Sequence, residues 1–237
     1  MSRRPPGRGP KKQAPAAAPG AALVARRDQR VYTAGQFRHA RTPLQVIEVT
    51  RHAEAVAEEA VRAAMKDVPP RTPPACREGC AWCCYKPVGT AAPEVLRIVA
   101  YLRETLSPER WGALGERVRA AARRPRGRSG QPCPLLVGDR CSAYPVRPLT
   151  CRGYNSSDAR RCERALSSPG GAEVPVYLPQ QQLAAFVLDG LRAGLGENRL
   201  DATLLELTAA LRIALETPTV EERWLAGEGV FVPARLD

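Results

Sequence analysis

The sequence predicts a mainly α-helical protein with a small, irregular, cysteine-rich metal-binding core, which contains a short hairpin and is packed by surrounding helices. Two observations lead to this fold class. Apolar residues recur at helical spacing in several segments that begin or end at capping residues or prolines. All eight cysteines lie between residues 76 and 162, where glycine and proline repeatedly interrupt regular structure.

Residues 1–30 are expected to form a disordered, basic tail rich in proline, alanine and glycine. They contain eight basic residues against Asp28 alone, so they carry +7 of the formal net charge of +12. They show no hydrophobic period and bury too little surface to offset the entropy of ordering. Nucleic acid binding by this tail is an interpretation that we do not favour, because a solvated extension explains the same composition. Residues 31–237 are expected to form a single cysteine-cluster metal-binding domain.

A first helix is predicted from Thr42, as N-cap, to Asp67, ahead of two consecutive prolines. His52 flanks its apolar stripe, which favours core packing or solvation over metal ligation. Between Cys133 and Cys141, two short extended pieces around a Gly-Asp pair predict a hairpin. Further helices are predicted at residues 92–106, 107–124, 156–166, 179–193, 201–216 and 220–226, so that C-terminal helices occupy residues 179–226.

The eight cysteines are the candidate metal ligands. No apolar run is long enough to span a membrane and no secretory signal is visible, so we expect a cytoplasmic protein without membrane contact. Thiols stay reduced in that compartment, which favours metal over disulfides. Thiolate sulfur is the soft ligand that zinc and iron–sulfur clusters select. The candidates are Cys76, Cys80, Cys83, Cys84, Cys133, Cys141, Cys151 and Cys162, and together they delimit a motif core at residues 76–162.

On a helical wheel the first four cysteines share one face, so a helix or a compact turn would bring their sulfurs together. The spacing leaves three arrangements open: two four-thiolate sites, one polynuclear site, or one site and a redox pair. Arg147 and Arg152 bracket Cys151 in sequence. They are the best candidates to contact ligating cysteines and compensate thiolate charge.

At these residues the sequence resembles the YkgJ-type cysteine-cluster family, also described as the CxxCxxCC zinc- or iron-chelating domain. The matching segments are Cys76-Arg77-Glu78-Gly79-Cys80-Ala81-Trp82-Cys83-Cys84, Cys133-Pro134-Leu135-Leu136, Cys141-Ser142-Ala143-Tyr144 and Arg147-Pro148-Leu149-Thr150-Cys151-Arg152. The resemblance implies a bacterial protein that binds metal or an iron–sulfur cluster. A similar cysteine pattern occurs in flagellin lysine methylases, but this chain shows no glycine motif for binding S-adenosylmethionine or a nucleotide.

Two functional hypotheses follow. In the first, the cysteines hold iron, as an iron–sulfur cluster, or zinc, and the protein is an oxidoreductase or modifying enzyme of unknown substrate. In the second, a structural zinc site supports a binding module that presents an Arg-rich surface to a protein or nucleic acid. In both, removal of the metal is expected to unfold at least residues 76–162.

Overall fold

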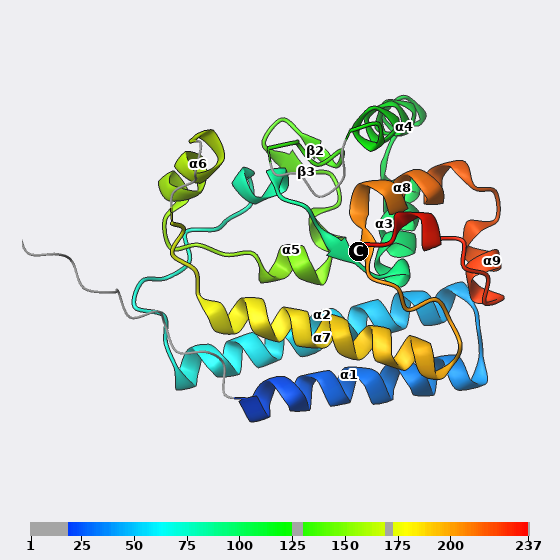
Figure 1. Cartoon of the computed structure of the whole chain (residues 1–237), viewed down its shortest axis with the longest axis horizontal. Coiled ribbons are helices and arrows are strands. Elements are labelled where there is room, and N and C mark those ends of the chain that lie inside the picture. The colour runs from blue at the N-terminus through cyan, green and yellow to red at the C-terminus, as the bar shows by residue number, and fades with distance from the viewer. Residues whose placement is uncertain (1–18, 125–129, 169–172, 237) are drawn as a thin grey trace, which may run out of the picture.

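The computed structural model describes residues 19–124, 130–168 and 173–236. Three long helices form its base: α1 (Pro19–His39), α2 (Pro43–Asp67) and α7 (Leu178–Glu197). They lie side by side along the lower edge of the molecule (Figure 1). The apolar stripe predicted for α2 is buried, including Val46, Val49 and Ala53. The prediction of a mainly α-helical protein is confirmed.

The start of α1 corrects the expected boundary of the tail. Residues 19–30 were expected to be disordered but form the first half of α1, whereas residues 1–18 lie outside the described residues. Ala22, Ala25 and Gln29 of this half are buried. Small side chains let α1 pack closely on α2 and α7, and this tertiary contact outweighs the weak local helical pattern.

A buried polar contact joins α1 to α2. Gln29 donates from Nε2 to Thr33 Oγ1 at 2.9 Å and to the Val49 carbonyl at 3.0 Å. Its Oε1 lies 2.7 Å from Nδ1 of His52, and the His52 ring stacks on Tyr32 with centroids 3.7 Å apart. His52 therefore packs between two helices, as expected, and burial lowers its pKa.

A second set of helices covers the other side of α2: α3 (Ala92–Thr105), α4 (Pro108–Ala122), α8 (Leu207–Glu216) and α9 (Val220–Leu225). α3 packs between α2 and α8, and α4 packs on α8. The core that they share includes Ile98, Leu102 and Leu211, all fully buried. None of the helices in the described ranges is long and apolar enough to cross a membrane.

The helix predicted at residues 201–216 begins only at Leu207. Residues 205–206 instead form β4 (Leu205–Glu206), which pairs antiparallel with β1 (Gly89–Thr90). The carboxylate of Glu206 accepts hydrogen bonds from the backbone N–H of Thr208 at 3.0 Å and of Ala209 at 2.8 Å. Glu206 thus caps α8, and the leucine before it belongs to a strand whose partner lies far away in sequence.

The cysteine-bearing elements lie on the upper left of Figure 1, above α7. The predicted hairpin is present: β2 (Leu136–Val137) pairs with β3 (Arg140–Cys141) through Gly138, whose φ of +60° favours glycine. The remaining elements are the 3₁₀-helices η1 (Trp82–Tyr85), η2 (Tyr144–Val146) and η3 (Val232–Ala234), and the short helices α5 (Leu149–Gly153) and α6 (Ala159–Ser167).

Candidate metal centre

The first four cysteines lie on a turn followed by η1, not on a regular helix. The backbone N–H of Cys80 donates to the Arg77 carbonyl at 3.0 Å. Gly79 has a φ of +85°, a conformation that breaks an α-helix and favours glycine. The N–H of Cys84 then bonds the Ala81 carbonyl at 2.9 Å. The segment is therefore the compact turn that was the alternative to a regular helix, and Gly79 is where a helix would be interrupted.

Four thiols, here called the outer cysteines, border one cavity of about 120 Å³. They are Cys76, Cys80, Cys83 and Cys162. Cys162 comes from α6, which packs on η1. Cys76 is held by Ser156, whose backbone N–H donates to the cysteine Sγ at 3.3 Å. The other walls are largely apolar and include Trp82, Leu166, Val174 and Val176.

The other four thiols, here called the inner cysteines, are Cys84, Cys133, Cys141 and Cys151. The N–H of Cys133 donates to the Cys84 carbonyl at 2.8 Å, which fixes the entry to the hairpin against η1. Cys141 ends the hairpin opposite Leu136. Cys151 lies on α5. The pKa of Cys84 is raised mainly by its hydrogen bond to Cys83, and that of Cys151 mainly by burial, and the thiols of Cys133 and Cys141 raise both further.

The adjacent pair Cys83–Cys84 joins the two groups. The Cys84 thiol donates a hydrogen bond to Cys83, which lowers the pKa of Cys83 to about 7, with help from Lys86 and Arg147. The same hydrogen bond, together with burial, raises the pKa of Cys84. Cys83 also acts electrostatically on Cys76 of the outer group and on Cys133 of the inner group.

Burial disfavours negative charge on most of the remaining thiols. It raises the pKa of Cys133 to about 12 and that of Cys151 well above the usual range. It also raises the pKa of Cys76 and Cys141, and neighbouring cysteines add to each of these shifts. Several thiolates can share this space only if a cation compensates their charge.

The donor set fits a thiolate metal site in its chemistry. All eight cysteines are free thiols, and the four outer ones border one cavity. Within the described ranges, however, no group of three His, Cys, Asp or Glu side chains has the arrangement needed to hold one metal ion. Metal binding therefore requires the sulfurs to turn toward a common centre.

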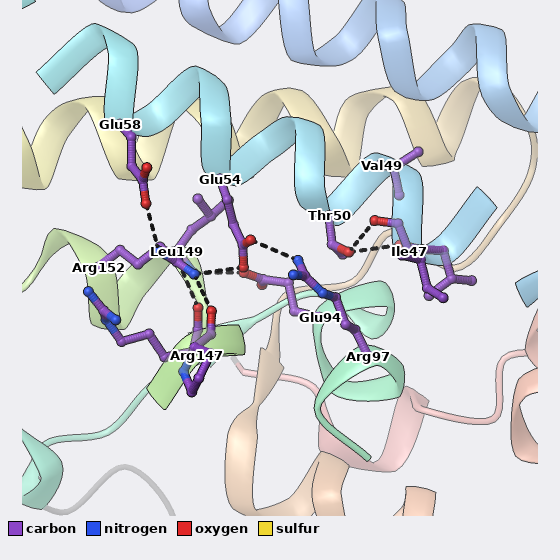
Figure 2. Close-up of polar contacts among 12 residues, drawn as sticks. Ile47, Val49, Thr50, Glu54, Glu58, Glu94, Arg97, Arg147, Leu149 and Arg152 are labelled. Atoms are coloured by element: carbon purple, nitrogen blue, oxygen red, sulfur yellow. Dashed lines mark hydrogen bonds and ion pairs between the residues drawn. The ribbon is translucent and has the colours of Figure 1, made fainter. Parts of the chain in front are cut away.

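Glu94 fixes the position of α5, which carries Cys151. This fully buried carboxylate at the start of α3 accepts hydrogen bonds from the N–H of Leu149 at 2.7 Å, the N–H of Ala91 at 2.9 Å and the hydroxyl of Thr90 at 2.9 Å. Figure 2 shows it beside Leu149. Burial raises its pKa, although the three donors oppose the shift. Glu94 thus fastens the first turn of α5 to α3.

We expect Glu94→Gln to destabilise the protein by about 1–3 kcal/mol. A carboxyl group accepts hydrogen bonds at both oxygens, and when protonated it still donates only to the Thr90 hydroxyl. Glutamine would turn its NH₂ group toward the N–H of either Leu149 or Ala91 and leave that donor buried and unpaired. Urea denaturation measures the loss.

The loss should depend on pH. Because the pKa of Glu94 is raised in the folded state, its contribution is fully present below the unfolded pKa and is lost as the pH rises through the folded pKa. The difference between wild type and variant should therefore be largest in acid and shrink toward neutral pH. Glu104→Gln, an exposed site on the same helix, is the control. Equal stability of Glu94→Gln and wild type at all pH values would contradict the assignment.

The two predicted arginines have different surroundings. Arg152 is fully engaged: it donates to the Arg147 carbonyl at 3.2 Å and the Pro145 carbonyl at 2.7 Å, and pairs with Glu54 at 2.8 Å and Glu58 at 3.0 Å. It ties α5 to α2, as Figure 2 shows. Arg147 stacks over the Tyr144 ring, 4.0 Å from its centroid. Its charge adds to the lowering of the pKa of Cys83, whose largest cause is the hydrogen bond from Cys84, and opposes the burial that raises the pKa of Cys141.

Sequence reasoning missed the carboxylates that hold this region. Glu94 lies ten residues after Cys84 but 55 residues before Leu149 of α5, which it contacts only through the fold. Glu54 pairs with both Arg97, at 2.9 Å, and Arg152. The sequence offers one weak local signal for each. Glu94 is an acidic residue in the first turn of a predicted helix. Glu54 is an acidic residue beside the apolar stripe of another.

Comparison with known families agrees with the chemistry of these thiols. A family model described as "CxxCxxCC: Putative zinc- or iron-chelating domain" matches residues 75–168. This range contains all eight cysteines and leaves α1, α2, α7, α8 and α9 outside. No curated protein and no solved structure gave a significant match to the chain. The family match supports metal binding, with zinc or iron as the metal. Residues 75–168 are thus similar to the domain described as "Putative zinc- or iron-chelating".

Proposed function

We propose that the protein is a metal-dependent redox or modifying enzyme in which the two cysteine groups form two metal sites. The outer cysteines would hold an iron–sulfur cluster, and the inner cysteines would hold a single zinc or iron ion. One observation supports this division above all: a cavity of about 120 Å³ opens among the outer cysteines. A single ion held by four sulfurs needs no such space, whereas a cluster with its bridging sulfides does.

The two sites would have different tasks. An iron–sulfur cluster supplies one-electron transfer. The apolar walls of the outer cavity, with Trp82 and Val176 among them, would exclude water from that site. The inner cysteines join the hairpin, η1 and α5, so an ion among them would stabilise the fold of this region.

Quantification of iron, zinc and sulfide in anaerobically purified protein tests this proposal. We expect iron matched by sulfide, with broad visible absorbance. The variants Cys80→Ser and Cys141→Ser control for each other. Cys80→Ser should lose sulfide and visible absorbance while the fold is kept. Cys141→Ser should lose the inner ion and lower the melting temperature.

A colourless protein that holds zinc and no sulfide would contradict the cluster. It would support the alternative function, a zinc-stabilised module that binds an acidic protein surface or nucleic acid. The exposure of Arg77, Arg140 and Arg160 around the cysteines favours that alternative. A folded protein without metal would contradict both.

A further inference from the structure

A second cavity, distinct from the outer one, lies between α2, α5 and α7. We call it the arginine groove. Its volume is about 320 Å³, which is in the range of small-molecule sites. It is lined by Arg62, Arg147, Arg152, Glu58, Gln180 and a set of apolar side chains. No function described so far accounts for it.

The charge of the groove is not balanced by the protein. The lining holds three arginines and one glutamate. Arg152 is paired with Glu58 at 3.0 Å and with Glu54, outside the lining, at 2.8 Å, so the unbalanced charge comes from the other two arginines. Arg62 is exposed on α2 and, within the described ranges, pairs with no carboxylate. Arg147 likewise pairs with no carboxylate there: one of its N–H groups donates to the Tyr144 carbonyl at 3.0 Å, and its plane rests on the Tyr144 ring. Both guanidinium groups keep N–H donors available.

The rest of the lining is apolar. Ala57, Val61 and Met65 present one side of α2, and Ala184 faces them from α7. A ligand that fits must therefore combine an oxyanion, which an arginine binds with two parallel hydrogen bonds, with an aliphatic or aromatic body. A bare inorganic anion would leave these walls unused.

We propose that the arginine groove binds a small organic anion, a carboxylate or phosphate with an apolar body, through Arg62 and Arg147. The proposal goes beyond metal binding and does not depend on it. Arg147 belongs to the segment that runs from Cys141 to Cys151. A ligand bound to Arg147 would therefore contact the segment that carries two of the candidate metal ligands.

Calorimetric titration of the full-length, metal-loaded protein with octanoate, octyl phosphate and octan-1-ol tests the proposal. We expect one or both anions to bind at least about tenfold more tightly than the neutral alcohol. A preference for octanoate indicates a carboxylate ligand, and a preference for octyl phosphate indicates a phosphate ligand. Acetate should bind much more weakly than octanoate, because it lacks the apolar body.

Arg62→Gln should weaken anion binding by about five- to tenfold, since one charge-assisted contact is lost. Arg62 makes no ion pair in the described part of the chain, so this variant is expected to fold. Arg51→Gln removes another exposed arginine from the same helix outside the groove and should leave binding unchanged.

Equal binding of octan-1-ol and octanoate, equal effects of the two variants, or no binding at all would overturn the proposal. Loss of metal with retained anion binding would refute only the proposed metal function.

Discussion

Removal of metal from the purified protein is expected to unfold residues 76–90 and 130–167 while α1, α2 and α7 stay folded. Structural metal in a small thiolate site contributes about 10–16 kcal/mol, against a net stability of about 5–15 kcal/mol for a whole domain. Two of the cysteine-bearing elements, η1 and α6, have no buried residue that could replace that contribution. Without the cation, the thiols must also protonate or repel one another.

The base of the molecule should survive because its contacts do not involve the cysteines. α1, α2 and α7 pack on one another through side chains such as Val49, Leu191 and Leu195, which are fully buried. The sequence led us to expect unfolding of at least residues 76–162. The structure predicts a shorter unfolded region, since α3 packs between α2 and α8 and should retain its protection.

Hydrogen exchange with and without a chelator under reducing conditions measures this pattern. Protection should fall in the two cysteine-bearing segments and return when zinc or iron is added back. Uniform loss of protection over all helices would show that the metal supports the entire chain. Unchanged protection in a protein proven to be metal-free would contradict the stabilising role of the inner cysteines.

The sequence predicted the elements whose signals are local. The helix predicted to start after Thr42 and end at Asp67 forms as α2, and the hairpin between Cys133 and Cys141 forms as β2 and β3. Capping residues, proline and a Gly-Asp turn determine the backbone conformation only of the few residues next to them. Periodic apolar positions then specify the buried face without knowledge of the partner helix.

What the sequence did not predict depends on contacts between distant segments. β4 exists because residues 205–206 meet residues 89–90, and helical periodicity in this stretch conceals that pairing. The division of the cysteines into two groups depends on where α6 and the hairpin lie relative to η1, which the spacing of cysteines does not encode. The attachment of Leu149 to Glu94 spans 55 residues.

α1 is the clearest such case, because the residues that allow it to pack belong to α7. Gly190 and Gly194 face α1 one turn apart. A Cβ at Gly190 would lie 2.3 Å from the carbonyl oxygen of Arg26, and one at Gly194 would lie 2.6 Å from that of Arg30. Real Cβ contacts essentially never fall below 3.0 Å. The two glycines therefore bring the backbones of α1 and α7 into direct contact.

Gly190→Ala and Gly194→Ala are each expected to destabilise the protein by about 1–3 kcal/mol, and the double variant by more. The atoms in the way are backbone atoms of α1, which cannot move aside as a side chain can, so the whole helix must shift. That shift would also strain the ion pairs of Arg26 with Asp189 and of Arg30 with Glu197, which flank the two glycines.

Gly35→Ala is the matched control. Gly35 lies inside α1, and a Cβ there would meet no atom within 4 Å, so alanine should stabilise the helix by about 0.5–1 kcal/mol. Urea denaturation gives the change in free energy, and hydrogen exchange in α1 shows whether that helix has separated from α7. Metal content should be unaffected, because the cysteine-bearing elements lie on the side of α7 that faces away from α1 (Figure 1). If Gly190→Ala were as stable as wild type with α1 still protected, the close packing of α1 on α7 would be disproved.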